Sequence, residues 1–243
     1  MMRLIKAVKG LMLALLNMRV VDLRSFQSKR IAIVGPASSA FNTGKGSYID
    51  GFDLVVRINK SAMTVDSAKH ENDIGRRTDV LFHCFVENLQ SGGGPLDFDL
   101  YDRLGIRYVI NPRNEWTGLR NSFNFYKKYL RQAKTYLLPR SLYVRIRQPL
   151  GGYRPTTGYS ALCALMESEF TELYITGFTF FKTAYGVGYR DEMKESKQAL
   201  SFIKGAGWHN PEYEFQEFKR LLQKNAHKKV ITDQELTNIL ATN

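Results

Sequence analysis

The sequence predicts an α/β protein, a single Rossmann-like domain in which helices flank a mostly parallel central sheet. Two observations carry this prediction. Short apolar runs rich in Val, Ile and Leu recur along the chain and end near Gly, Asn or His, as buried parallel strands do. Longer stretches with helical periodicity separate them, which is typical of right-handed crossovers between parallel strands. The chain has 243 residues, 44% of them hydrophobic and 24% charged, which excludes a disordered or rod-like protein.

The elements alternate along the chain. We predict strands at residues 31–35, 53–59, 79–83, 106–111 and 172–177. We predict helices near residues 120–133, 158–168, 211–225 and 233–241. The polar, glycine-punctuated residues 182–207 have no periodicity and are typical of a lid or binding loop. Because ligands of such sheets bind beyond the carboxyl ends of the strands, the residues that follow each strand are the candidates for a site.

An amphipathic helical extension is expected over residues 1–30, ahead of a domain formed by residues 31–243. Residues 4–17 predict a short helix with Lys6 and Lys9 near its start. Its apolar part is shorter than the roughly 18 to 20 residues that a membrane-spanning helix needs. The helix therefore either lies on a membrane surface or covers the domain.

Cysteine and histidine are few and scattered. Two cysteines, Cys84 and Cys163, are too few for a disulfide framework and indicate a reducing compartment, so we expect a cytoplasmic protein, with peripheral contact at the inner face of the membrane as one option. The four histidines and two cysteines show no metal-ligand spacing, so no metal site is expected.

Positive charge is concentrated in one part of the chain. The formal net charge is +12, and residues 103–154 hold twelve Lys and Arg against one acid, Glu115. Such a segment attracts nucleic acid, an anionic membrane or an acidic substrate, whereas a merely solvated surface normally mixes both signs. Tyr and Phe interleave with the basic residues at 123–147, but no recognisable nucleic-acid module accompanies them.

Two short segments have the residues of a phosphate or nucleotide site. Residues 35–39 follow the first predicted domain strand and end in Ser38 and Ser39, whose hydroxyl and N–H groups can bind a phosphate or ribose. This loop is neither a P-loop nor a dinucleotide fingerprint, and alone it is equally typical of a structural turn. Asn59 ends the next strand and can offer a donor and an acceptor to a base or ribose, or simply form a turn.

A predicted helix begins directly after Pro155-Thr156-Thr157-Gly158. Thr156 or Thr157 would cap this helix, whose free N–H groups and positive dipole end suit a phosphate. An ordinary cap without a ligand is the alternative for this segment.

His209 is the candidate general base. Asn210 fits the N-cap and Pro211 the first position of the helix that follows, so the imidazole lies just outside a helix N-terminus. The positive potential there disfavours imidazolium, and a neutral imidazole can take a proton from a hydroxyl group. A structural histidine is the alternative for this residue.

Three segments in register resemble one enzyme family. Residues 31–78, 154–178 and 209–214 are similar to the long, short and terminal His-x-x-x-x-Glu motifs of the sialyltransferase family of glycosyltransferases, in its eukaryotic-type branch. The resemblance spans roughly residues 31 to 220. The chain looks like a short bacterial-type or viral-type member that lacks the family's membrane anchor.

The resemblance implies a sialyltransferase-like α/β fold and an activity. Family members transfer a sugar acid from a cytidine monophosphate (CMP) donor with inversion and without a metal or other cofactor. The acceptor expected here is a hydroxyl group of a glycan or glycolipid, and the basic residues 103–154 favour an acidic one. Relatives that use other 3-deoxy sugar acids make Kdo an alternative to sialic acid. No nucleic-acid partner is implied.

Carried over by position, the resemblance assigns roles to individual residues. It makes His209 the catalytic base. It places the nucleotide on Ser38, Ser39, Asn59, Thr156, Thr157 and Gly158, and further phosphate or donor contacts on Gly177, Tyr185, Tyr189 and Arg190.

The chain also departs from the family pattern. Ile31 and Phe170 stand where the family commonly has a disulfide, and packing between them would make the same link. Pro36 replaces an Asn of the first loop, which removes one expected nucleotide contact. A second family His is missing, so Tyr189, Arg190 or Lys182 must supply donors to the leaving phosphate. A catalytically inactive relative and a nucleic-acid-binding module therefore stay as alternative functions.

Overall fold

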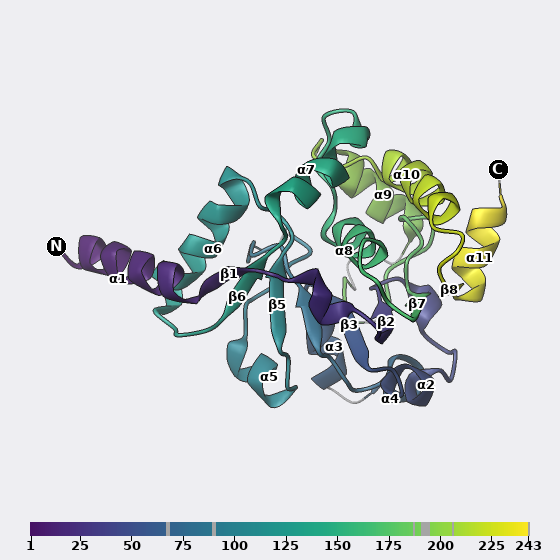
Figure 1. Ribbon diagram of the computed structural model, residues 1–243, viewed down its shortest axis with the longest axis horizontal. Helices are drawn as coiled ribbons and strands as arrows, with labels where there is room; N and C mark the ends of the chain where they lie inside the picture. Colours follow the sequence, from purple (N-terminus) through teal and green to yellow (C-terminus); the bar gives the residue numbers. More distant parts are fainter. Residues whose placement is uncertain (67–68, 89–90, 187, 191–194, 206, 243) are drawn as a thin grey trace.

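Eight parallel strands form one sheet in the computed structural model of the chain, which describes residues 1–66, 69–88, 91–186, 188–190, 195–205 and 207–242 (Figure 1). The strands are β1 (Met18–Val20), β2 (Arg30–Val34), β3 (Leu54–Ile58), β4 (Val80–Phe82), β5 (Tyr108–Asn111), β6 (Thr135–Leu137), β7 (Glu172–Thr176) and β8 (Val230–Thr232). Their order across the sheet is β1-β6-β5-β4-β3-β2-β7-β8, and every neighbouring pair is parallel. The predicted fold class is confirmed.

Helices cover both faces of this sheet (Figure 1). The longer ones are α1 (Met2–Asn17), α6 (Trp116–Tyr129), α7 (Arg140–Arg147), α8 (Thr157–Met166), α9 (Ser196–Gly205), α10 (Pro211–Lys224) and α11 (Gln234–Ala241). The short ones are α2 (Gly46–Asp50), α3 (Ser61–Asp66), α4 (Glu71–Ile74), α5 (Phe98–Arg103) and three 3-10 turns, η1 (Leu23–Phe26), η2 (Ser38–Ala40) and η3 (Gln148–Leu150).

The alternation of side chains along the strands divides the core between the two faces. On β2, Ile31 and Ile33 belong to the core cluster that includes α7, α8 and α10. Ala32 and Val34 belong to a cluster with residues of α2, α3 and α4. Because both faces are covered, the central strands are largely apolar, with the buried Arg57 of β3 as an exception, and this is the signal that the sequence carries. Ile31 and Phe170 lie in the same core cluster, where the family disulfide was expected to be replaced by packing.

Most predicted elements are confirmed, with shifts of a few residues at their ends. The five predicted strands are β2, β3, β4, β5 and β7, and the predicted helices are α1, α6, α8, α10 and α11. Strands β1, β6 and β8, of three residues each, were not predicted. Helix α9 lies within the stretch expected to lack periodicity, of which residues 187, 191–194 and 206 lie outside the described part.

The first thirty residues contribute to the sheet as well as to a helix. α1 packs against α6, and β1 pairs with β6 at one edge of the sheet. Phe26, in η1, is fully buried in the main core cluster. The segment expected to be an extension, residues 1–30, therefore contributes one strand, β1, to the sheet of the domain.

Candidate functional site

The carboxyl ends of β2 and β7 form the topological switch point of the sheet, because the chain leaves β2 toward β3 on one side and returns as β7 on the other. Gly35 and Gly177 follow these two strands and their backbones touch. A Cβ atom on Gly35 would lie 2.2 Å from the Gly177 carbonyl oxygen, and Gly177 itself has a φ of +74°. Glycine is needed at both positions to allow this approach.

A cavity of about 790 Å³ opens beside this crossing, a size typical of small-molecule sites. Four separate segments bring predicted site residues to its wall. The predicted residues that line it are Asn59, Thr156, Thr157, Gly158, Gly177, Tyr185, Tyr189, Arg190 and His209. The fold therefore joins, around one space, residues that lie up to 150 positions apart in the sequence.

The N-terminus of α8 opens onto this cavity. Thr156 is its N-cap, and the Thr156 hydroxyl accepts a hydrogen bond from the Tyr159 N–H. The N–H groups of Thr157 and Gly158 come before the first intrahelical hydrogen bond and so have no partner within the helix. These two N–H groups and the Thr157 hydroxyl are the groups that an anion at this helix end would meet.

Glu214 holds Thr156, the N-cap of α8, in place. Its carboxyl oxygens accept hydrogen bonds from the Thr156 N–H at 2.6 Å and from the Thr156 hydroxyl at 2.7 Å. The side chain is only 2% exposed, and this burial raises its pKa to about 8, although the two hydrogen bonds oppose the rise. Glu214 thus ties the terminal motif to the Pro-Thr-Thr-Gly motif, a role that the sequence analysis did not assign.

His209 faces the same cavity and lies five residues before Glu214, just ahead of α10. Asn210 caps α10 by accepting hydrogen bonds from the Glu212 and Tyr213 N–H groups, and Pro211 is its first residue, as predicted. His209 Nδ1 lies 2.6 Å from the Arg154 carbonyl oxygen. Because a carbonyl only accepts, Nδ1 carries the hydrogen, and the neutral ring keeps a free electron pair on Nε2.

The environment of His209 favours its neutral form. Burial lowers its pKa, and the positive charges of Arg113 and Arg154 lower it further, against the opposing hydrogen bond to the Arg154 carbonyl. Burial is thus the main cause, rather than the helix end that the sequence suggested. The result is the same, a ring able to accept a proton near neutral pH.

Arginines give this cavity its charge. Arg113, Arg154 and Arg190 line it, and the buried Glu214 is the acidic residue found among its described lining residues. Arg154 lies over the exposed ring of Trp208, 4.3 Å from its centroid, and Arg113 pairs with Glu115 at 3.1 Å. The cavity therefore suits an anionic ligand. Neither Arg113 nor Trp208 is marked by a motif, so the sequence analysis missed them.

Asn59 connects two walls of the cavity. It is 7% exposed and adopts a left-handed conformation with φ +52°, so it is also the turn-forming residue that its alternative interpretation predicted. Its side-chain oxygen accepts a hydrogen bond from the Cys84 N–H at 3.0 Å. Its side chain also bonds the buried hydroxyl of Tyr189, which donates to the Gly92 carbonyl. Only part of the Asn59 amide is left for a ligand.

Tyr185 and Tyr189 pack together along this wall, with ring centroids 5.2 Å apart and ring planes tilted by 35°. The segment that contains Tyr185 pairs with the loop after β2, since Ala37 and Tyr185 form a bridge. Arg190 is 4% exposed and lies over the Phe202 ring. Lys182, the other expected donor, lies on the Phe215 ring instead and is absent from the described cavity lining.

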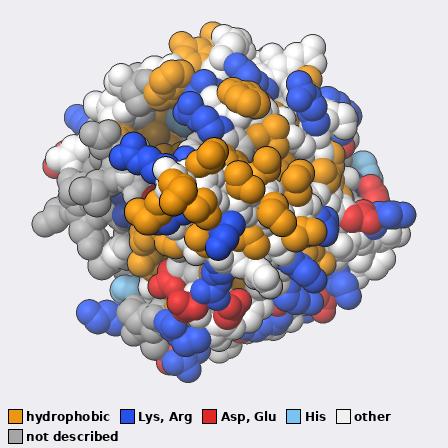
Figure 2. Space-filling view, turned by 90° about the vertical axis from the view of Figure 1, so that its left-hand side faces the viewer, with side chains coloured by type: hydrophobic (Ala, Val, Ile, Leu, Met, Phe, Trp, Pro, Cys, Tyr) orange, Lys and Arg blue, Asp and Glu red, His pale blue; other side chains and the backbone are white. Residues whose placement is uncertain are grey.

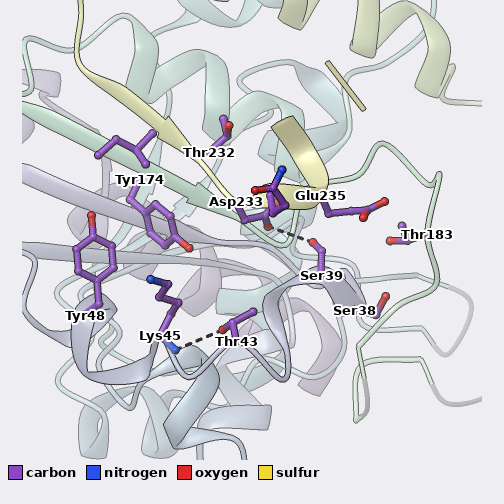
Figure 3. A pocket seen from close by; sticks show the side chains of 12 residues that line it. Ser38, Ser39, Thr43, Lys45, Tyr48, Tyr174, Thr183, Thr232, Asp233 and Glu235 are labelled. Atoms are coloured by element: carbon purple, nitrogen blue, oxygen red, sulfur yellow. Dashed lines mark hydrogen bonds between the residues drawn. The ribbon is translucent and has the colours of Figure 1, made fainter. Parts of the chain in front are cut away.

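Ser38 and Ser39 line a second cavity, of about 650 Å³, on the other side of the loop after β2 (Figure 3). Lys45, Tyr48 and Tyr174 lie at one end of it, and Asp233 and Glu235 at the other. The Ser39 hydroxyl bonds Asp233 at 3.2 Å. The structure therefore separates these two serines from the other predicted nucleotide-binding residues, whereas Pro36 and Ala37 of the same loop line the larger cavity.

The basic segment 103–154 does not form a free cationic face. Several of its members lie within 4 Å of acidic groups, most of them from other segments: Arg107, Arg113, Lys128, Arg131, Arg145 and Arg147. These pairs lower the charge available to an extended polyanion. A nucleic-acid interface gains no support from this arrangement.

The described residues contain no group of three His, Cys, Asp or Glu side chains arranged to hold a metal ion. Among the same residues, no helix combines the length and the apolar character needed to cross a bilayer.

The family model of glycosyltransferase family 29 (sialyltransferase) matches residues 2–91. No curated protein sequence matches the chain. Solved sialyltransferases share its fold. A mammalian sialyltransferase superposes with a TM-score of 0.56 and 17% identity, over 93% of this chain and 78% of its own.

Two bacterial structures from Campylobacter jejuni are also similar. The sialyltransferase CstII, solved with the substrate analogue CMP-3FNeuAc, has a TM-score of 0.51 and 13% identity, over 87% of this chain and 84% of its own. An α-2,3-sialyltransferase in its apo form has a TM-score of 0.52 and 16% identity, over 90% of this chain and 80% of its own. The predicted resemblance and fold are confirmed.

Proposed function

Because the chain has the fold of sialyltransferases and matches their family model over residues 2–91, we propose that it transfers a sugar acid from a CMP-linked donor to a hydroxyl group of a glycan or glycolipid. One observation carries most of this proposal. The N-terminus of α8 and the imidazole of His209 line the same cationic cavity at the switch point of the sheet. An anion-binding group and a base thus share one space.

The donor phosphate would lie at the N-terminus of α8. The Thr157 and Gly158 N–H groups point their dipoles toward a ligand there, and the Thr157 hydroxyl adds a third donor. Glu214 keeps this turn in place through both of its bonds to Thr156. Asn59 would approach the cytidine or ribose with the part of its amide that Cys84 and Tyr189 leave unused.

Transfer would be a single displacement with inversion. The acceptor hydroxyl loses its proton to His209 Nε2, and its oxygen forms a bond to the anomeric carbon. The bond from that carbon to the phosphate oxygen breaks as the new bond forms, and CMP leaves with the electron pair. The α8 N-terminus and Arg190 would stabilise the leaving phosphate and need no metal ion.

The transferred sugar is of the sialic-acid type or another 3-deoxy sugar acid such as Kdo. Both bring a carboxylate in addition to the donor phosphate, and the cavity has cationic side chains for more than one anion. Arg154 and Trp208 lie next to His209 at the acceptor side. Their stacked pair would favour an acceptor with a negative charge.

Thermal unfolding with CMP, CDP, UDP, GDP and NAD tests the donor class. We expect CMP at 100 times its Kd to stabilise the protein by about 2.7 kcal/mol, or a Tm increase of about 5 to 10 °C, and UDP and GDP to have little effect. Equal stabilisation by all nucleotides would contradict the proposal. CMP release from CMP-sialic acid and CMP-Kdo then separates an active transferase from an inactive relative.

A further inference from the structure

Helix α1 packs against the protein with its small side chains. Gly10 and Ala14 are its buried residues, and they face α6. The approach is close, because a Cβ atom on Gly10 would lie 2.7 Å from the Lys127 Cα. A surface helix of a globular protein normally buries its large apolar residues instead. In α1 the arrangement is reversed.

The large apolar residues of α1 point away from the protein. Leu4, Val8, Leu11 and Leu15 repeat at helical spacing along one side and are 70%, 52%, 51% and 71% exposed. Ile5, Met12 and Leu16 widen this side and are exposed as well. Figure 2, which looks at the end of the molecule that carries α1, shows one broad apolar area there. We call these seven residues the apolar face of α1.

Positive charge accompanies this face. Arg3, Lys6 and Lys9 are exposed on the same helix, and residues 2–17 contain no Asp or Glu. At 100° per residue, Lys9 lies at the border of the apolar face and Lys6 beyond it. Figure 2 shows further Lys and Arg side chains around the apolar area. A wide apolar face with Lys9 at its border, on a helix whose charged residues are all cations, fits helices that lie in the plane of a membrane surface.

We propose that the apolar face of α1 inserts into the surface of an anionic lipid bilayer, with the axis of α1 parallel to that surface. The exposed Leu and Met side chains enter the boundary between headgroups and acyl chains, and the lysines and Arg3 contact anionic headgroups. Sixteen residues with three cations lie on the bilayer and do not cross it.

Charge also argues against a second copy of the chain as the occupant. Two α1 helices joined through their apolar faces would bring their cations together, and neither helix has an acid to pair with them. A lipid surface supplies both the apolar medium and the negative charge. The proposal concerns this helix alone, so it stands or falls separately from the transferase activity.

Cosedimentation of the full chain with vesicles tests the proposal. We expect binding to phosphatidylcholine vesicles that contain one quarter phosphatidylglycerol, and at least about tenfold weaker binding to pure phosphatidylcholine. The triple variant Leu4→Ser, Leu11→Ser, Leu15→Ser should bind both kinds of vesicle about tenfold more weakly, or weaker still. Its Tm should stay unchanged, because all three side chains are exposed. Lys6→Gln with Lys9→Gln should reduce binding to the anionic vesicles alone.

Met63→Ser is the matched control, since Met63 is an exposed apolar residue of α3. This variant should bind vesicles like the unchanged protein. Equal vesicle binding by the triple variant would overturn the proposal. Sedimentation velocity adds a second arm: a dimer that the triple substitution dissociates would assign the face to another copy of the chain and would equally overturn the lipid assignment.

Discussion

Two cavities flank the loop that follows β2, and the same short loop lines both. Pro36 and Ala37 face the larger one, and Ser38 and Ser39 face the smaller. Both cavities are large enough for a small molecule and both have hydroxyl groups in their walls. They differ in charge and in the state of their polar groups.

Asp233, one of the two acidic residues that line the smaller cavity, is already engaged by the protein. Asp233 accepts hydrogen bonds from the Ser39 hydroxyl, the Thr176 hydroxyl and the Gly177 N–H, and it caps α11. These bonds hold the glycine crossing from one side. The larger cavity instead has arginines, helix N–H groups without a partner in their own helix, and an imidazole whose pKa is lowered by burial. This difference is why we place the proposed anion site in the larger cavity, with its helix N–H groups and arginines, and not beside the hydroxyls of Ser38 and Ser39.

His209→Ala should produce the largest effect, a fall in transfer rate of about 10² to 10⁴-fold, because the acceptor hydroxyl loses its base. CMP binding should change by less than about threefold. In the unchanged enzyme the rate should fall only at pH values below 6.5, since the His209 pKa lies below that ordinary value. Initial rates and calorimetry with CMP measure both quantities.

His227→Ala is the matched control, because His227 is exposed after the end of α10. It should keep the normal rate and pH profile. A rate for His209→Ala within threefold of normal would remove the imidazole from the mechanism and with it the main contrast between the two cavities.

Glu214→Gln should change how stability depends on pH. The folded-state pKa of about 8 lies above the ordinary value of 4.5, so the folded protein holds a proton that the unfolded chain has lost between these values. Glu214 therefore makes the free energy of unfolding fall as pH rises through this window, by roughly 1.4 kcal/mol per unit. The Gln variant lacks this slope and still has donor and acceptor groups for Thr156.

Urea unfolding at pH 5.5, 6.5, 7.5 and 8.5 measures the slope as the difference between variant and unchanged protein. Glu212→Gln, at an exposed position of the same helix, should leave the pH dependence of the free energy of unfolding unchanged. Parallel curves for Glu214→Gln and the unchanged protein would show that Glu214 is ionised when folded.

Much of the sheet could be predicted because its central strands are buried on both faces. Ile31–Val34 is a continuous apolar run for that reason, and Leu54–Ile58 is apolar except for the buried Arg57. The edge strand β8, by contrast, is partly exposed and only three residues long, and β1 at the other edge is as short. Their pairing depends on distant partners such as β7 and β6, which no local pattern reveals.

The candidate site was predicted where a motif fixes local geometry. Thr156 and Asn210 are helix caps, and capping determines which way the neighbouring groups face. The loop of Ser38 and Ser39 has no such constraint in the sequence, since its direction is set by its bridge to Tyr185. Arg113 reaches the cavity from a different crossover of the sheet, and only the folded chain shows this.

The smallest effect gives the most direct comparison of the two cavities. Thr157→Ala removes a hydroxyl from the larger cavity, and we expect about tenfold weaker CMP binding, because a hydrogen bond to a charged group is lost. Ser39→Ala removes a hydroxyl from the smaller cavity. CMP binding should then change by less than about twofold, while stability falls by about 1 kcal/mol, because Asp233 loses one of its donors.

Calorimetry with CMP and urea unfolding on both variants measure the pair, and each variant serves as the control of the other. The reverse pattern, with Ser39→Ala weakening CMP binding and Thr157→Ala leaving it unchanged, would place the nucleotide on the serine side of the loop. It would also separate the nucleotide from His209, since the imidazole faces the larger cavity. The two substitutions thus decide which side of one five-residue loop holds the donor.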